Sequence, residues 1–307
     1  MIAAACGDSD DGADETSAPE TTAAPETTAA PETTAATETT AAPETTTTAD
    51  PGKQYGGEVV VADDQEPATL NWAVPGGDNV IVSLIGQAYW AGVQEIDGFT
   101  LELLPELVTE LPTVANGGVV IHEDGTMTGN SVLRDEAVWS DGTPISGDDL
   151  QFTLDIILDP DLPVTKQVYE DIVSSEAGPK TFTYTLAQPT VQYELLFGTI
   201  IPKHAVEGSD FTTDWNETMW PSAGPFVFDS WQKGEFVKLG RNANDWKTDA
   251  ETGQQVPYLD SVVFRFIPET ESIITAFKGR EVDVIQPPPS TDTIEALQAL
   301  ESEGAII

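Results

Sequence analysis

Residues Ser131–Leu158, SVLRDEAVWSDGTPISGDDLQFTLDIIL, carry the clearest structural pattern in the chain. The first part, 131–139, mixes β-branched and aromatic residues with three charged ones and is interpreted as a strand. Residues 140–144, SDGTP, predict a tight turn, because Asp, Gly and Pro each favour turn geometry. Ser146 then begins a helix, with Asp149 three residues later as an approximate capping box.

The helix that follows has one apolar face, and further strands and helices are predicted along the rest of the chain. Leu150, Leu154, Ile157 and Leu158 recur at helical spacing. Further strands are predicted at 58–62, 119–122, 181–186, 226–231, 236–242 and 261–267. Further helices are predicted at 80–91, 271–277 and 291–302.

The run from Leu133 to Ile145 resembles the signature of family 5 of the extracellular solute-binding proteins, which serve oligopeptide and nickel ABC importers. The residues at 220–226, WPSAGPF, resemble a second motif of the same family, with Ser222 and Ala223 where Gly and Thr are usual. The resemblance implies an α/β periplasmic-binding-protein-like fold of type II (cluster C), with mixed sheets and flanking helices. It covers residues 57–307 but only the first half of the family's pattern.

The resemblance also implies how the chain is divided. The expected parts are a truncated lipoprotein signal at 1–6, a disordered linker at 7–53, a discontinuous first lobe at 54–86 and 185–284, an inserted subdomain at 87–184, and the start of a second lobe at 285–307. Because family members run on for about as long again, we expect the chain to be a fragment whose second lobe is largely missing.

The N-terminal residues MIAAACG resemble the lipobox of a bacterial lipoprotein, in which Cys6 would carry the lipid. The alternative is an incidental free thiol. Cys6 is the only cysteine, so neither a disulfide framework nor a cysteine-based metal site is expected.

The linker repeats Ala-Pro-Glu-Thr-Thr-Ala and contains almost no large apolar side chain. Such a segment cannot bury enough surface to offset the entropy of ordering, which predicts disorder. Together with a lipidated Cys6, it predicts a tether. We therefore expect an extracytoplasmic protein on the outer face of the cell membrane, at the cell surface or in the periplasm, with the lipid anchor as its only membrane contact.

The formal charge of −41, from 53 acidic and 12 basic residues, argues against nucleic-acid binding. The acidity either steers cationic ligands or makes a soluble, salt-adapted surface. His122 and His204 lie far apart in a chain with one cysteine, so no metal site and no cofactor are expected.

Two parts of the sequence are candidate ligand contacts, and both are inferred from the resemblance to family 5. The first is a Gly-rich loop whose backbone can approach a ligand closely. It consists of Pro75, Gly76, Gly77, Asp78 and Asn79. The second is Tyr169, at about the place where peptide-binding members pack an aromatic ring on their ligand. The alternatives are a plain surface turn for the loop and a packing role for Tyr169.

The expected function is capture of a small extracellular ligand, with a short peptide favoured, and its delivery by a monomeric protein to an ABC permease and its ATPase. No catalytic residue is expected. A sensory or adhesive surface lipoprotein with the same fold is the alternative. An extracellular hydrolase is disfavoured because the sequence contains no nucleophile-elbow motif.

Overall fold

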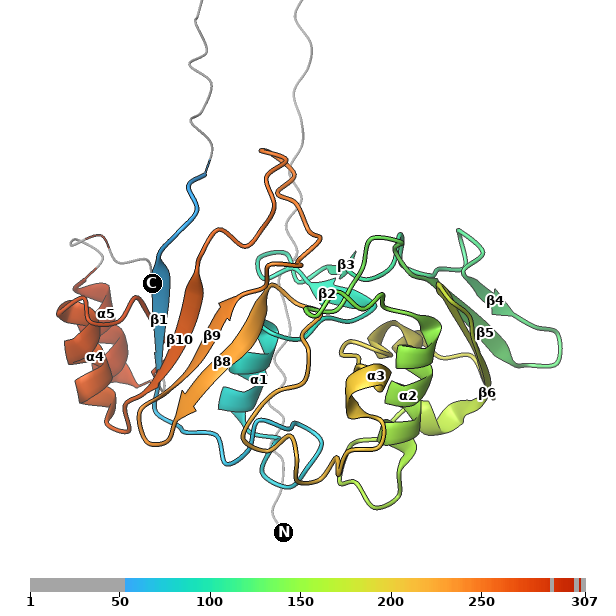
Figure 1. Ribbon diagram of the computed structural model, residues 1–307, viewed down its shortest axis with the longest axis horizontal. Coiled ribbons are helices and arrows are strands. Elements are labelled where there is room, and N and C mark those ends of the chain that lie inside the picture. The colour runs from blue at the N-terminus through green and yellow to red at the C-terminus, as the bar shows by residue number, and fades with distance from the viewer. Residues whose placement is uncertain (1–52, 288–289, 301–303, 305–307) are drawn as a thin grey trace, which may run out of the picture. The chain divides into compact units, whose positions relative to one another are not determined.

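The computed structural model describes residues 53–287, 290–300 and 304. Two larger β-sheets, each packed on its own apolar core, form most of this part of the chain (Figure 1). The expected lipobox, Cys6 and nearly all of the expected linker lie outside the described residues.

The first sheet has five strands in the order β11-β1-β10-β9-β8. The strands are β1 (Glu58–Asp63), β8 (Phe226–Gln232), β9 (Phe236–Arg241), β10 (Ser261–Phe266) and β11 (Val284–Ile285). β1 pairs in parallel with both β10 and β11, whereas β8, β9 and β10 are antiparallel. The start of the described chain therefore lies beside strands from near its end.

Helices cover both faces of this sheet (Figure 1). Alternate residues of a strand point to opposite faces. Val61 packs with the core that contains Ile81 of α1 (Val80–Gln87), whereas Ala62 packs with Ile273 of α4 (Thr270–Lys278).

The second sheet is antiparallel, with four strands in the order β4-β5-β7-β6. The strands are β4 (Val119–Ile121), β5 (Met127–Val132), β6 (Ile172–Ala177) and β7 (Thr181–Leu186). Helix α2 (Gly147–Leu158) packs against β6 and β7 and buries Leu150 and Leu154 with Trp139 and Phe182.

The remaining elements are short. They are the hairpin strands β2 (Gln94–Ile96) and β3 (Leu103–Pro105), the 3₁₀ helices η1 (Tyr169–Asp171) and η2 (Val191–Leu195), and helices α3 (Lys203–Val206) and α5 (Thr291–Gln298). Within the described ranges, no helix has the length and hydropathy to span a membrane.

Most of the predicted elements are confirmed, including α2 with Ser146 as its N-cap. The strand predicted at 131–139 is wrong beyond Val132. Leu133 makes only an isolated bridge to Val108, and the chain then turns through the charged run 134–136, where Ala137 donates to the Arg134 carbonyl. The charged side chains face solvent or make polar contacts there, whereas Leu133, Ala137 and Trp139 are buried in the core. The predicted boundaries of the subdomain and of the second lobe stay predictions.

Candidate functional site

A pocket of about 830 Å³ brings most of the predicted ligand contacts together. Its lining includes Pro75, Gly76, Gly77 and Asp78 from the Gly-rich loop and Tyr169 from η1, almost a hundred positions later in the chain. The volume lies within the range of about 300–1,000 Å³ that is usual for small-molecule sites. We call it the Tyr169 pocket.

The Gly-rich loop is shaped by backbone geometry that side chains would disturb. Gly76 has a φ of +86°, in the left-handed region. A Cβ added to Gly77 would lie 2.0 Å from the Asn71 carbonyl oxygen, so the loop folds back on the chain before it only with glycine there. The loop backbone is thereby held at the edge of the pocket.

Asn79, the fifth predicted loop contact, does not line the pocket. Its side chain instead accepts a hydrogen bond of 3.1 Å from the Val82 N–H and so caps α1. Asn is among the preferred N-cap residues. The structure thus gives Asn79 a positioning role, in which it fixes the helix that follows the loop.

Tyr169 both packs and lines the pocket. Its ring meets Phe197 edge to face, with the ring centroids 5.4 Å apart, and its hydroxyl oxygen accepts the Phe197 N–H at 2.6 Å. Burial raises the pKa of Tyr169 to about 12, so the phenol stays neutral at physiological pH. Because the oxygen acts as an acceptor, the hydroxyl proton can still be donated.

Two tryptophans in the pocket wall were not predicted as contacts. Trp72 and Trp90 line it, and the indole N–H of each is buried without a hydrogen-bond partner among the described residues. Trp90 lies against Gly86, where a Cβ would come within 2.0 Å of the ring. No motif in the sequence marks either tryptophan as a ligand contact.

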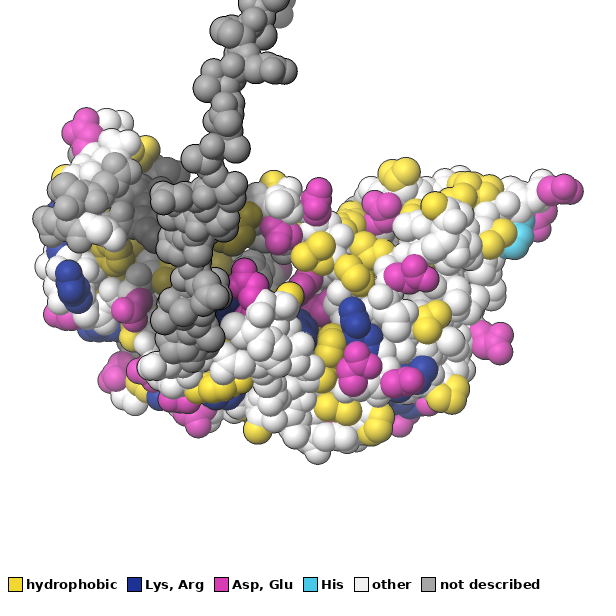
Figure 2. All heavy atoms as spheres, turned by 90° about the horizontal axis from the view of Figure 1, so that it is seen from above, with side chains coloured by type: hydrophobic (Ala, Val, Ile, Leu, Met, Phe, Trp, Pro, Cys, Tyr) yellow, Lys and Arg dark blue, Asp and Glu magenta, His cyan; other side chains and the backbone are white. Residues whose placement is uncertain are grey.

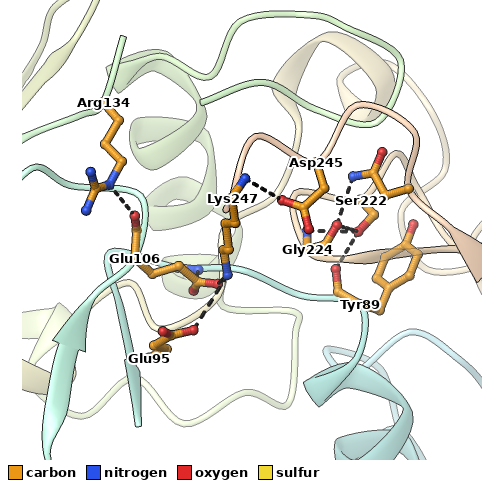
Figure 3. Close-up of polar contacts among 10 residues, drawn as sticks. Tyr89, Glu95, Glu106, Arg134, Ser222, Gly224, Asp245 and Lys247 are labelled. Atoms are coloured by element: carbon orange, nitrogen blue, oxygen red, sulfur yellow. Dashed lines mark hydrogen bonds and ion pairs between the residues drawn. The ribbon is translucent and has the colours of Figure 1, made fainter. Parts of the chain in front are cut away.

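The second motif, at 220–226, supports the end of α1 (Figure 3). Ser222 Oγ donates to the Tyr89 carbonyl at 2.6 Å, and the Gly224 N–H donates to Ser222 Oγ at 2.9 Å. The Asn242 side chain in turn donates to the Gly224 carbonyl at 2.8 Å. A Cβ on Gly224 would lie 2.6 Å from the Tyr89 carbonyl oxygen, which is why glycine is needed here.

A partly buried ion pair joins the β9–β10 connection to the segment after β3 (Figure 3). Lys247 Nζ bonds one carboxylate oxygen of Glu106, while the other oxygen accepts the Gly92 N–H at 2.8 Å. Burial raises the pKa of Glu106, and Lys247 partly opposes this. Burial alone would lower the pKa of Lys247, but Glu106 and Glu95 outweigh it and the pKa is raised.

The two histidines do not form a metal site in the described chain. His204 Nε2 lies 2.8 Å from an Asp141 carboxylate oxygen, and His122 Nε2 lies 2.8 Å from the Thr128 hydroxyl oxygen. Within the described ranges, no three His, Cys, Asp or Glu side chains gather as metal ligands would.

Known proteins with a similar sequence belong to one family of binding proteins. A family model described as bacterial extracellular solute-binding proteins, family 5 middle, matches residues 112–304. The oligopeptide-binding protein AppA of Bacillus subtilis is 24% identical over 249 residues, which are 78% of this chain and 42% of AppA.

Two solved structures extend the comparison. The periplasmic EDTA-binding protein EppA is 26% identical, with a TM-score of 0.68 over 82% of this chain and 47% of EppA. The oligopeptide-binding protein from Thermus thermophilus, complexed with a pentapeptide, is 22% identical and shares the fold, with a TM-score of 0.65 over 78% of this chain and 47% of that protein.

The chain therefore spans less than half the length of these relatives. The family match covers more than half of the chain, and the mixed α/β fold implied by the sequence motifs is confirmed. The chain belongs to family 5 of the bacterial extracellular solute-binding proteins.

Proposed function

We propose that the chain forms part of a surface lipoprotein that captures short peptides outside the cytoplasm and delivers them to an ABC importer. The observation that carries the proposal is the Tyr169 pocket, in which a glycine-rich backbone, three aromatic side chains and one carboxylate face a common space. The oligopeptide-binding relatives support peptide as the ligand class.

The chemistry of the pocket suits a peptide. Asp78 is the only charged side chain in its lining, so the pocket favours a positive ligand group such as an N-terminal ammonium. Trp72, Trp90 and Tyr169 offer aromatic faces that bind apolar side chains of varied shape. The exposed loop at Gly76 leaves backbone groups for pairing with a peptide backbone.

Capture would proceed by closure of two lobes around the ligand, with the described chain supplying one wall. A ligand shifts such an equilibrium only through its different affinity for the open and closed forms. Delivery to the permease, anchoring through Cys6 and the monomeric state belong to this proposal.

Thermal-shift titration of the full-length protein tests the ligand class. A tripeptide mixture with free N-termini should raise Tm, and the same mixture N-acetylated should raise it less, because the ammonium opposite Asp78 is gone. Asp78→Asn should weaken the best peptide by about fivefold, corresponding to about 1 kcal/mol for a partly exposed pair.

Asp161→Asn is the matched control, because Asp161 is an exposed carboxylate outside the pocket lining. EDTA serves as the competing ligand, since the EppA relative binds it. A shift with EDTA and none with peptides would overturn the peptide assignment. The acidic lining argues against that result.

A further inference from the structure

A second pocket, of about 360 Å³, lies between the β2–β3 hairpin, β5, β7 and η2. It shares no lining residue with the Tyr169 pocket, although Phe197 lines one and its neighbour Gly198 lines the other. Its apolar wall consists of Val93, Leu103, Leu111, Leu196 and Phe197. We call it the β2–β3 pocket.

Three buried polar side chains line this pocket without a hydrogen-bond partner in the described part of the protein. They are Gln94, Ser131 and Tyr184, with 8%, 2% and 3% of their surface exposed. None of their polar atoms is among the fully buried unpaired ones of the described residues, so these atoms are open to the cavity. Three hydrogen-bonding groups open to one cavity are available to the polar atoms of a ligand.

Glycine at position 129 leaves space for the Tyr184 side chain. The Tyr184 ring lies across Gly129 of the neighbouring strand β5, and a Cβ on Gly129 would stand 2.5 Å from the Tyr184 hydroxyl. Burial raises the pKa of Tyr184 well above its ordinary value, so its hydroxyl remains a neutral donor and acceptor.

The charged side chains that line the β2–β3 pocket are all negative. Glu102 and Glu194 are the only charged side chains in its lining, and both are exposed, which places them at its mouth. Glu194 accepts a hydrogen bond of 3.4 Å from Tyr193, whereas the Glu102 carboxylate has no partner among the described residues. Figure 2, which views the molecule from above Figure 1, shows hydrophobic and acidic side chains interspersed with a smaller number of Lys and Arg side chains.

We propose that the β2–β3 pocket binds a small organic amine with an aromatic body and a polar group at its far end. The ammonium would lie between Glu102 and Glu194 at the mouth, the ring among the apolar wall residues, and the polar end against Gln94, Ser131 and Tyr184. At about 30 Å³ per water, the cavity equals about twelve waters, which suits a ligand of about ten non-hydrogen atoms.

Isothermal titration of the full-length protein with tyramine, a hydroxyphenyl ethylamine, tests this. Tyramine should bind. Tyrosol, which replaces the ammonium with a hydroxyl, should bind at least tenfold more weakly, and so should phenethylamine, which lacks the ring hydroxyl. 4-Hydroxyphenylpropionate, with the opposite charge, should not bind.

Variants assign the binding to this pocket. The double variant Glu102→Gln/Glu194→Gln should weaken tyramine at least tenfold and leave tyrosol unchanged. Tyr184→Phe keeps the ring and should bring the affinity for tyramine close to that for phenethylamine. Glu123→Gln, at the exposed β4–β5 turn, is the matched control and should change nothing.

Three results would overturn the proposal: no binding of tyramine, equal affinity for tyramine and tyrosol, or binding that the double glutamine variant leaves intact. Tyramine binding that Asp78→Asn abolishes and the double variant spares would place the amine in the Tyr169 pocket instead. Each of these outcomes is independent of whether the Tyr169 pocket binds peptides.

Discussion

Asp245 is a carboxylate that the fold buries with one oxygen unpaired. Oδ1 accepts the Lys247 backbone N–H at 3.1 Å, while Oδ2 is buried without a hydrogen-bond partner among the described residues. Burial raises the pKa of Asp245 from its ordinary value of 3.8. The folded protein therefore holds this proton more tightly than the unfolded chain does.

We expect Asp245→Asn to stabilise the protein at neutral pH. Between pH 3.8 and the raised pKa, the unfolded chain releases the proton first, so the contribution of Asp245 to stability falls as pH rises. Asp245→Asn has no carboxyl group to ionise at this position, so its stability does not fall in this way. Its free energy of unfolding at pH 7 should exceed that of wild type by about 1–3 kcal/mol, which is the cost of an unsatisfied buried group.

Urea unfolding at a series of pH values measures the effect. The difference between Asp245→Asn and wild type should vanish below pH 3.8, where Asp245 is protonated in both states. Asp161→Asn, at an exposed position, should show no such trend. A variant that is less stable than wild type at pH 7 would show that the carboxylate finds a cation or donor in solution.

Lys247 should be costly to remove alone. Lys247→Met leaves Glu106 buried without its cation and is expected to cost about 3 kcal/mol in the free energy of unfolding. The double variant Glu106→Gln/Lys247→Met should cost less than Lys247→Met alone, since no unpaired charge remains. Denaturant unfolding of Glu106→Gln, Lys247→Met and the double variant measures the coupling between the two residues. A loss of stability in the double variant equal to the sum of the two single losses would contradict a coupled pair.

Tyr169 needs a milder change than removal of its ring, because the ring packs against Phe197. Tyr169→Phe keeps the ring but leaves the Phe197 N–H without its acceptor, which should cost about 1–3 kcal/mol of stability. Tyr55→Phe is the control: its hydroxyl also bonds a backbone group, the Gln255 carbonyl, but 47% of the residue is exposed, so water replaces the bond. Equal losses in the two variants, measured by urea unfolding, would show that the Phe197 contact contributes nothing specific.

At the scale of elements, α2 depends on the carboxylate of Asp149. It accepts the Ser146 N–H and the Lys203 N–H, both at 2.9 Å, and so joins the start of α2 to α3. Asp149→Ala should cost about 3 kcal/mol, because two backbone donors lose a charged acceptor. Asp148→Ala, one position earlier and exposed, should stay near wild type in the same urea titration. Similar losses in both would assign the effect to the helix dipole rather than to these bonds.

Local patterns explain which elements were predictable. Strand-type residues at 119–122 and alternation at 181–186 predicted β4 and β7, since those signals are local to the strands themselves. The break after Val132 was missed because it depends on Leu107 and Val108, which hold the next residues by backbone contacts from another segment.

The candidate site was predictable only through the resemblance to a known family. That resemblance singled out Tyr169 and the Gly-rich loop, and the fold brings them together. It could not show that Asn79 caps α1 or that Trp90 lies on Gly86. The β2–β3 pocket had no sequence signal, since Gln94, Ser131 and Tyr184 come from three separate strands.

At the scale of the whole molecule, the two sequence motifs of the family meet in space. The Ser140 N–H donates to the Ser222 carbonyl at 2.7 Å, and the Ser222 N–H donates to Ser140 Oγ at 2.9 Å. Asn244 adds a bond of 2.7 Å to the Ser140 carbonyl. Through these contacts the turn before α2 is fixed to the segment that enters β8.

Peptide capture by the complete protein in the Tyr169 pocket can be measured by native mass spectrometry of the full-length protein after incubation with a random tripeptide mixture. We expect one retained peptide per protein molecule. The bound fraction should fall at least tenfold in Asp78→Asn/Tyr169→Ala when that variant is confirmed to be folded. A protein that retains no peptide, or a folded double variant that retains as much as wild type, would contradict peptide capture in this pocket.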